Sequence, residues 1–311
     1  MNKTFEANQT YREVFSKFPF TYYGAIAYKK LAKSNSTRPK NLIEYSSIQP
    51  VNLNFNSNKL KIKDPKIGKN SKERLKRIRI LVNLGLNESA IFEIRHIERE
   101  IRKTFSGTLW VSDLYAKAGA HKESQRLLEL FAKFKTKMRQ RELPLIFWKR
   151  FFPLIFKQYI YSQAKLFNID PLMMTSVIRQ ESVFDHNSMS FAGARGLMQI
   201  MPFTGKRFYQ PEKENRDFQA NFLFDPIVNI RIGTRYLKEL YSKYNGNWVK
   251  ILSCYNAGPE AVAEWELRFS ETKDPDEFVE RIPFPETRNF VKRVLRNRGA
   301  YRTIYEKNLA S

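Results

Sequence analysis

The stretch from Asp170 to Phe184 constrains the fold most, because its pattern is that of one buried helix. Asp170 is a favoured helix cap, and Pro171 occupies the first helical position, where its missing N–H breaks no hydrogen bond. Apolar side chains then recur at helical spacing, at Met174, Val177, Ile178 and Phe184. The pattern therefore predicts a helix packed against a core.

Glu181 projects from the apolar face of this predicted helix, since it follows Ile178 by three residues and Val177 by four. A carboxyl group against apolar surface loses hydration, which raises its pKa and keeps its proton available near neutral pH. A general acid that cleaves a glycosidic bond needs this property. The spacing alone leaves a second interpretation open, in which Glu181 is a helix-end residue exposed to water.

Alternation typical of strands is scarce along the chain, so the sequence predicts an all-α fold with at most a short hairpin. Residues 8–33 are predicted to form a helix or a helix pair with aromatic anchors. Short antiparallel helices punctuated by Gly or Ser are predicted at 74–84, 87–103, 108–118 and 122–136. They indicate stacked helical hairpins, although the repeat is too weak to name a family.

Positive charge is concentrated in the first half of the chain. The formal net charge is +24, with 32 Lys and Arg against 13 Asp and Glu in residues 1–150, and 23 against 18 in residues 151–311. Such a field attracts polyanions, including nucleic acid, anionic peptidoglycan, teichoic acids and phospholipid head groups. A basic surface that is simply solvated is the alternative.

The single cysteine, Cys254, excludes an internal disulfide, and its apolar surroundings predict a buried structural thiol rather than a nucleophile. His96, His121 and His186 show no ligand spacing with it, so we expect no metal and no cofactor. Residues 1–6 lack the apolar core of a secretory signal.

The apolar run at 143–161 is interrupted by Lys149, Arg150 and Lys157, so it is not predicted to span a membrane.

Four motifs follow one another in the second half of the chain. They are Glu181-Ser182 with the segment SFAGARGLMQIMP at 190–202, LFDP at 223–226 with Asn229 and Gly233, CYNAGP at 254–259, and IPFPETR at 282–288. With these motifs the chain resembles, over roughly 150–305, the catalytic domain of the soluble lytic transglycosylases that cut bacterial peptidoglycan. The part before 150 resembles more loosely the end of the helical superhelix and the linker domain of those enzymes.

The resemblance implies an all-α chain with a lysozyme-like transglycosylase domain preceded by a helical linker and a partial α-superhelix region. We expect terminal superhelix helices at 1–33, an extended linker at 34–70, a helical linker domain at 71–145 and the lysozyme-like catalytic domain at 146–311. Because most of the superhelix is missing, we expect that no ring closes around a glycan strand. The resemblance also implies a periplasmic or cell-envelope location, which a fragment or an unusual export route would reconcile with the missing signal.

The resemblance further implies a lyase reaction that cleaves the β-1,4 bond between N-acetylmuramic acid and N-acetylglucosamine and leaves 1,6-anhydromuramyl ends. Glu181 would act first as acid and then as base, while the 2-acetamido group of the substrate replaces a protein nucleophile. Substrate contacts carried over from the family are Ser182, Ser190, Gln199, Met201, Tyr255, Asn256 and Glu286.

Each of these contacts has a structural alternative: a turn cap for the two serines, a loop-capping amide for Gln199, plain core for Met201 and Tyr255, support of the Tyr255 loop for Asn256, and an ion pair for Glu286. Asp185, four residues after Glu181, is interpreted as a hydrogen-bonding helix-end residue rather than a second catalytic acid.

Two residues depart from the family pattern. Glu260 stands where Gly is usual, which puts a positive φ there in doubt. Phe290 stands where Tyr is common, so any contact of that hydroxyl is lost.

The expected partners are peptidoglycan glycan strands, with anionic wall polymers or a membrane surface as further candidates; nucleic acid and metal are not expected. The competing functions are a lysozyme-like hydrolase of the same bond and a non-catalytic basic binding module.

Overall fold

The computed structural model describes residues 2–18, 20–34, 65, 67–132, 143–210, 217–272 and 274–305. Within these ranges the chain is helical, and its only β pairing is a set of isolated bridges that join Arg195 to Met189 and Ile200. The predicted all-α class is confirmed.

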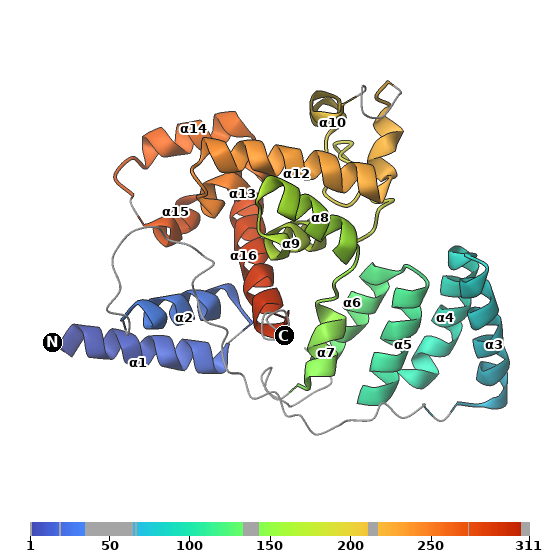
Figure 1. Cartoon of the computed structure of the whole chain (residues 1–311). Coiled ribbons are helices and arrows are strands. Elements are labelled where there is room, and N and C mark those ends of the chain that lie inside the picture. Colours follow the sequence, from blue (N-terminus) through green and yellow to red (C-terminus); the bar gives the residue numbers. More distant parts are fainter. Residues whose placement is uncertain are drawn as a thin grey trace. The chain divides into compact units, whose positions relative to one another are not determined.

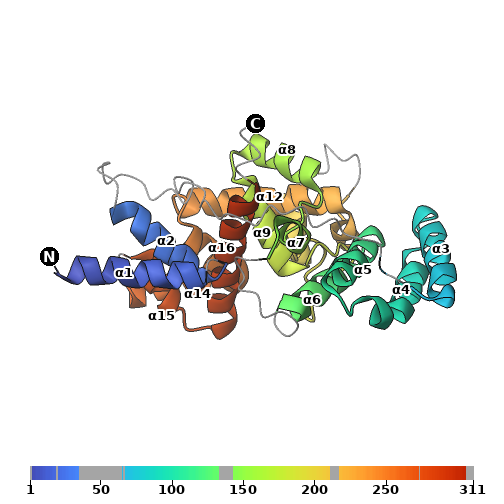
Figure 2. The same cartoon turned by 90° about the horizontal axis from the view of Figure 1, so that it is seen from below.

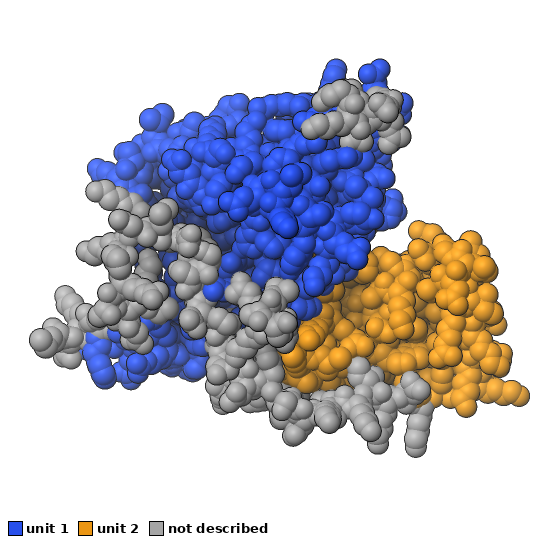
Figure 3. Space-filling view, viewed as in Figure 1, with its two compact units in different colours: residues 1–51, 154–182, 186–311 blue, residues 52–153, 183–185 orange. Residues whose placement is uncertain are grey.

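The chain divides into two compact units, which Figure 3 colours separately. Unit 1 comprises residues 1–51, 154–182 and 186–311, and unit 2 comprises residues 52–153 and 183–185. Most of the linker predicted at 34–70 lies outside the described residues.

Unit 2 is built from helices α3 (Lys69–Asn83), α4 (Asn87–Ile101), α5 (Phe105–Lys117), α6 (His121–Leu130) and α7 (Leu145–Phe151). Helix α3 packs against α4, and α5 packs against α6, as the predicted hairpins require (Figure 1). Gly85 and Gly119 follow α3 and α5 with φ of 71° and 72°, a conformation that glycine adopts without strain. Residues 133–136 of the last predicted helix lie outside the described residues.

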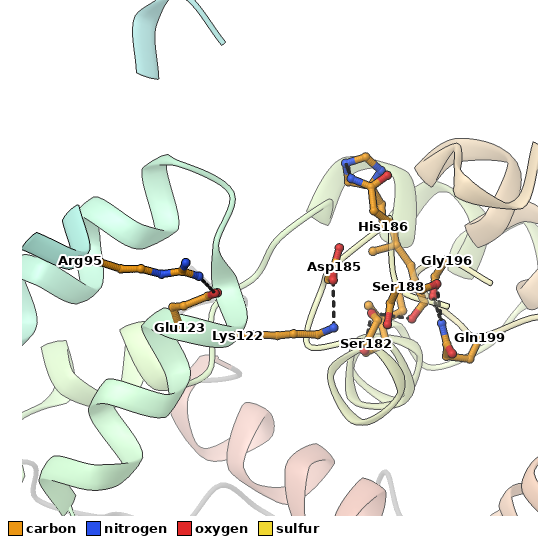
Figure 4. A network of polar contacts seen from close by, with 12 residues as sticks. Arg95, Lys122, Glu123, Ser182, Asp185, His186, Ser188, Gly196 and Gln199 are labelled. Carbon is orange, nitrogen blue, oxygen red and sulfur yellow. Dashed lines mark hydrogen bonds and ion pairs between the residues drawn. The ribbon is translucent and has the colours of Figure 1, made fainter. Parts of the chain in front are cut away.

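The hairpins of unit 2 share one apolar core, in which Ile78, Ile94 and Val111 are fully buried. The hydroxyl of buried Tyr115 donates to Oε2 of Glu98 at 2.7 Å, so this polar group is satisfied inside the core. The short segment 183–185 belongs to the same unit, and Lys122 Nζ donates to Asp185 Oδ2 at 2.9 Å (Figure 4).

Helix α9 (Pro171–Glu181) is the central helix of unit 1. Every side chain from Leu172 to Arg179 is buried, because α16 (Pro285–Tyr305) and α8 (Lys157–Phe167) both pack against it. Asp170 caps it as predicted and accepts from the backbone N–H groups of Leu172 and Met173 at 2.8 and 3.3 Å. The helix is therefore buried more completely than a single apolar stripe suggests.

The sequence pattern placed Phe184 on the helix, but α9 ends at Glu181. Val183 and Phe184 adopt positive φ values of 53° and 64°, and Phe184 reaches the core from this turn. Positive φ is rare for a β-branched residue such as Val183 and stores backbone strain. The chain therefore changes direction directly behind Glu181.

The rest of unit 1 consists of α10 (Pro202–Phe208), η3 (Ala220–Phe224), α12 (Pro226–Lys243), α13 (Trp248–Ala257), α14 (Pro259–Arg268) and α15 (Pro275–Arg281). Asp225 caps α12 and accepts from the N–H of Ile227 at 2.8 Å. Helix α12 packs against α8 and α13, and α13 packs against α16 (Figure 1).

Residues 8–33 form a helix pair, α1 (Asn2–Lys17) and α2 (Tyr22–Ser34), which belongs to unit 1. Helix α2 packs against α16, as both views show (Figure 1 and Figure 2). Lys30 also donates to Asp274 at 2.9 Å, which ties α2 to the start of α15. None of the helices in the described ranges has the length and apolarity needed to cross a bilayer.

Candidate active site

Glu181 is the last residue of α9 and is partly buried. Burial, and to a smaller degree the negative charge of Glu286, raises the pKa of its carboxyl group to about 8. At neutral pH the group therefore holds its proton, in contrast to a glutamate exposed to water. A protonated carboxyl group with this pKa can donate a proton and later accept one.

Tyr255, on α13, lies within reach of the charge of Glu181. Burial is the main cause that raises its pKa well above the usual range, and the charge of Glu181 is the next. Its hydroxyl donates to the carbonyl oxygen of Met198 at 2.6 Å. The structure thus brings the tyrosine of the CYNAGP motif together with the predicted acid.

The ring of Tyr255 contacts two aromatic side chains. Phe290 on α16 stacks on it with ring centroids 6.4 Å apart, and Tyr236 on α12 lies at 5.2 Å. Phe290, which departs from the family pattern, therefore supports the ring of Tyr255 rather than supplying a hydroxyl. The position of Tyr236 within the helical spacing of α12 does not predict this contact.

Glu286 lies in the first turn of α16, directly after Pro285, and its side chain is exposed. No described residue forms an ion pair with it, and Arg288 instead donates to the carbonyl oxygens of Glu280 and Ile282 at 3.4 and 3.2 Å. The side chain of Glu286 is therefore accessible to solvent or a ligand, and its charge acts on Glu181.

The two predicted serine contacts are committed to the protein itself. The buried hydroxyl of Ser182 donates to the carbonyl oxygen of Leu197 at 2.8 Å. The hydroxyl of Ser190 accepts from the N–H of Ala194 at 3.0 Å and closes the turn at 190–194. The Ser190 bond matches the turn-capping alternative, whereas the Ser182 bond joins the end of α9 to the loop at Leu197. Neither bond tests a direct substrate contact.

Gln199 has a positive φ of 47° and directs its amide nitrogen at the carbonyl oxygens of Ser188 and Gly196, at 3.0 and 2.8 Å (Figure 4). No described residue donates to its Oε1, so this oxygen remains available as an acceptor. Met201 occupies the N-cap position of α10, makes no capping hydrogen bond with its side chain, and is partly buried. None of these observations tests its predicted contact with the substrate.

Asn229, a member of the second motif, holds the loop beside Glu181 in place through three hydrogen bonds. Its fully buried amide accepts from the N–H of Met198 at 2.8 Å and donates to the carbonyl oxygens of Arg195 and Leu223 at 2.9 and 2.7 Å. Gly196 lies against it: a Cβ there would come 2.4 Å from the amide nitrogen and 2.0 Å from Leu223 O. The absence of a side chain at Gly196 thus permits this close approach of the backbone.

Asn256 accepts from the hydroxyl of Thr287 at 2.6 Å, which links the end of α13 to the start of α16. This bond favours the supporting role for Asn256. The positive φ of the CYNAGP motif falls on Gly258, at 88°, whereas Glu260 is helical within α14, so its replacement of a glycine introduces no backbone strain.

Cys254 is fully buried. Burial is the main cause that raises the pKa of its thiol, which disfavours the reactive thiolate. Among the described residues, no group of three or more His, Cys, Asp or Glu side chains could hold a metal ion.

Together these residues give an α-helical unit in which a buried helix ends in a protonated glutamate, close enough to Tyr255 and Glu286 for their charges to interact. The comparisons make the class specific. Residues 158–278 match the family model of the transglycosylase SLT domain.

Related sequences carry the same family name. The soluble lytic murein transglycosylases of Escherichia coli K12 and Salmonella typhimurium are each 36% identical to the chain, over 151 and 155 residues, which is 49% of this chain and 23% of each relative. The chain therefore spans about a quarter of the length of these relatives.

Solved structures of the family share the fold. The 70 kDa soluble lytic transglycosylase from Escherichia coli matches 99% of this chain and 44% of its own length, with a TM-score of 0.74 and 22% identity. An inactive mutant of the lytic transglycosylase Slt from Pseudomonas aeruginosa matches 97% of this chain and 43% of its own, with a TM-score of 0.67 and 24% identity.

Proposed function

We propose that the chain is a peptidoglycan lytic transglycosylase, in which Glu181 is the catalytic acid and base. The observation that carries this proposal is the partly buried carboxyl group of Glu181 at the end of α9, whose pKa is raised to about 8. A group with this pKa exists in both protonation states near neutral pH, as one residue that acts twice requires.

In the first step, protonated Glu181 transfers its proton to the oxygen that links N-acetylmuramic acid to N-acetylglucosamine. The bond from C1 to that oxygen breaks, and the 2-acetamido group of the substrate stabilises the positive charge that develops at C1. The carboxylate of Glu181 then takes the proton of the C6 hydroxyl, whose oxygen forms the new bond to C1. The acid is regenerated, water is not consumed, and a 1,6-anhydromuramyl end results.

We infer that neither Asp185 nor Glu286 acts as the second carboxylate of an ordinary glycosidase. Asp185 is engaged by Lys122 at 2.9 Å. The charge of Glu286 raises the pKa of Glu181. Because the side chain of Glu286 is exposed, we assign it a contact with the substrate rather than a role as nucleophile. This arrangement supports the single-acid route.

Of the other site residues, some contact the substrate and others support the loops around it. Tyr255 orients the reacting sugar or the Glu181 carboxyl group, Gln199 offers its free Oε1, and Met201 contacts the glycan or its peptide. Ser182, Ser190 and Asn256 hold the loops that carry these groups. The substrate is located in the bacterial cell envelope, so we infer that the protein acts there, in the turnover of the wall.

Digestion of purified peptidoglycan, followed by mass spectrometry of the products, tests the proposal. Anhydromuramyl products, each one water lighter than a reducing end, are expected from the unchanged protein. Glu181→Gln should fold and bind glycan, but its rate of peptidoglycan cleavage should fall by a factor of about 10²–10⁴. The control Glu260→Gln removes an exposed acid of α14 and should retain the rate.

Products that incorporate heavy oxygen from labelled water would instead identify a lysozyme-like hydrolase. Turnover that persists in Glu181→Gln would remove the proposed mechanism. Salt-sensitive binding to polyanions without any cleavage would identify a basic binding module.

A further inference from the structure

One face of helix α3 in unit 2 remains exposed while the opposite face is packed. The helix buries Ser71, Leu75 and Ile78 on the side of the core. On the opposite side the exposed residues include Lys69, Lys72, Lys76, Arg79 and Ile80, and Leu84 follows at the end of the helix. Spacings of three and four residues place these side chains along one surface.

The charge of this surface is strongly positive. Lys69, Lys72 and Arg79 form no ion pair with any described residue, while Lys76 lies 3.0 Å from Glu73, the one exposed acid of the helix. Exposed lysine and arginine side chains within one helix repel each other, so an anionic partner would relieve an unfavourable interaction.

Large aliphatic side chains are exposed where α3 ends. Ile80, Leu84 and Leu86 are 58%, 67% and 51% exposed. Gly85, between the two leucines, has φ of 71° and open space around its Cα. The turn thus presents a small apolar tip directly beside the cations of the helix. We name these seven residues, Lys69, Lys72, Lys76, Arg79, Ile80, Leu84 and Leu86, the α3 face.

We propose that the α3 face binds the surface of an anionic phospholipid membrane. Lysine and arginine side chains are attracted to anionic head groups, and aliphatic side chains gain by entering the boundary between head groups and acyl chains. A nucleic acid would satisfy the cations but leave the three aliphatic side chains in water. A second copy of the chain, which presents the same positive face, would cover the leucines but bring like charges together.

The membrane contact would lie in unit 2, while the predicted catalytic acid lies in unit 1. Membrane attachment and the reaction at Glu181 would therefore depend on different residues. Loss of one leaves the other measurable, so the failure of this inference is distinguishable from the failure of the proposed function.

Sedimentation of the full chain with lipid vesicles tests the proposal. Vesicles of phosphatidylcholine with phosphatidylglycerol should bind the protein, vesicles of phosphatidylcholine alone should not, and added salt should weaken the binding. The triple variant Lys69→Gln, Lys72→Gln, Arg79→Gln should lose about 100-fold in partition coefficient, because each cation contributes about fivefold. Its matched control is Lys206→Gln, Lys243→Gln, Arg293→Gln, which removes three exposed cations from unit 1.

The apolar tip is tested by Leu84→Ser with Leu86→Ser, which should weaken binding while the dependence on salt persists. Circular dichroism should show an unchanged helical content in each variant, since all of the altered side chains are exposed. The proposal would be overturned if neutral vesicles bound the protein as strongly as anionic vesicles. It would also be overturned if the triple variant and its control lost the same factor in partition coefficient. A dimer that the two serine substitutions abolish, without any vesicle binding, would identify a second copy of the chain as the occupant.

Discussion

The hydroxyl of Tyr255 donates to the main-chain carbonyl of Met198 across 2.6 Å, joining α13 to the loop that follows the proposed catalytic acid. The N–H of the same residue, Met198, donates to Asn229 on α12 at 2.8 Å. One peptide segment is therefore fixed from two helices. The charge of Glu181 also acts on Tyr255, so this fixed loop and the acid share one site.

Tyr255→Phe should keep the ring contacts with Phe290 and Tyr236 but lose the hydrogen bond to Met198. We expect a loss of about 1 kcal/mol in the free energy of unfolding, which urea denaturation measures. Turnover of peptidoglycan should fall by a larger factor than this small loss of stability accounts for, if the hydroxyl orients the acid or the sugar. Tyr241→Phe is the control, because Tyr241 lies on α12 like Tyr236 and is not among the residues whose charge acts on Glu181. Equal rates in the two variants would contradict the role of Tyr255.

Glu286→Gln should lower the pKa of Glu181, because it removes the second cause that raises it. The alkaline limb of the pH–rate profile should therefore move to lower pH. The shift should be partial, since burial of Glu181 is the larger cause and is unchanged. Glu260→Gln should leave the limb in place, and an identical profile for both variants would show that the charge of Glu286 does not reach the acid.

The raised pKa of Glu181 also predicts how stability changes with pH. Between its ordinary value of 4.5 and about 8, the folded protein holds this proton and the unfolded chain does not. Its contribution to stability is therefore complete below pH 4.5 and is lost as the pH rises towards 8, by up to about 1.4 kcal/mol per pH unit.

Glu181→Gln removes this titration. The difference in unfolding free energy between the unchanged protein and Glu181→Gln should then fall from pH 5 to 8 and level off above, as denaturation at a series of pH values would record. A difference that does not vary with pH would mean that the carboxyl group is ionised in the folded protein.

Gly196→Ala should be severely destabilising. The added Cβ would lie 2.0 Å from Leu223 O in a backbone with φ of 74°, and neither the carbonyl nor the buried amide of Asn229 can move freely. We expect a loss of more than about 3 kcal/mol, measured by thermal or urea denaturation, together with loss of turnover. Gly193→Ala is the matched control, since φ is 86° there but nothing lies within 4 Å of the Cβ; it should cost about 1 kcal/mol.

The sequence by itself determined the local features of this protein. Asp170 and Pro171 begin α9, Asp225 begins α12, and Gly85 and Gly119 follow α3 and α5, because caps and turns depend on residues within about four positions. The spacing that placed Glu181 in an apolar face is a local pattern as well. The four motifs carry the resemblance to the soluble lytic transglycosylases, and each motif is a short stretch of the chain.

Only the tertiary structure decided how these elements act on one another. Glu181 interacts electrostatically with Glu286 and Tyr255, which lie far from it in the chain. The turn at Val183 and Phe184 ends the helix where the sequence pattern predicts that it continues. Desolvation and electrostatic attraction or repulsion depend on distance in space and on surrounding atoms, which the order of residues does not give. For the same reason, the packed fold alone assigns the hydroxyl of Ser182 to Leu197 and the amide of Asn229 to the loop beside the acid.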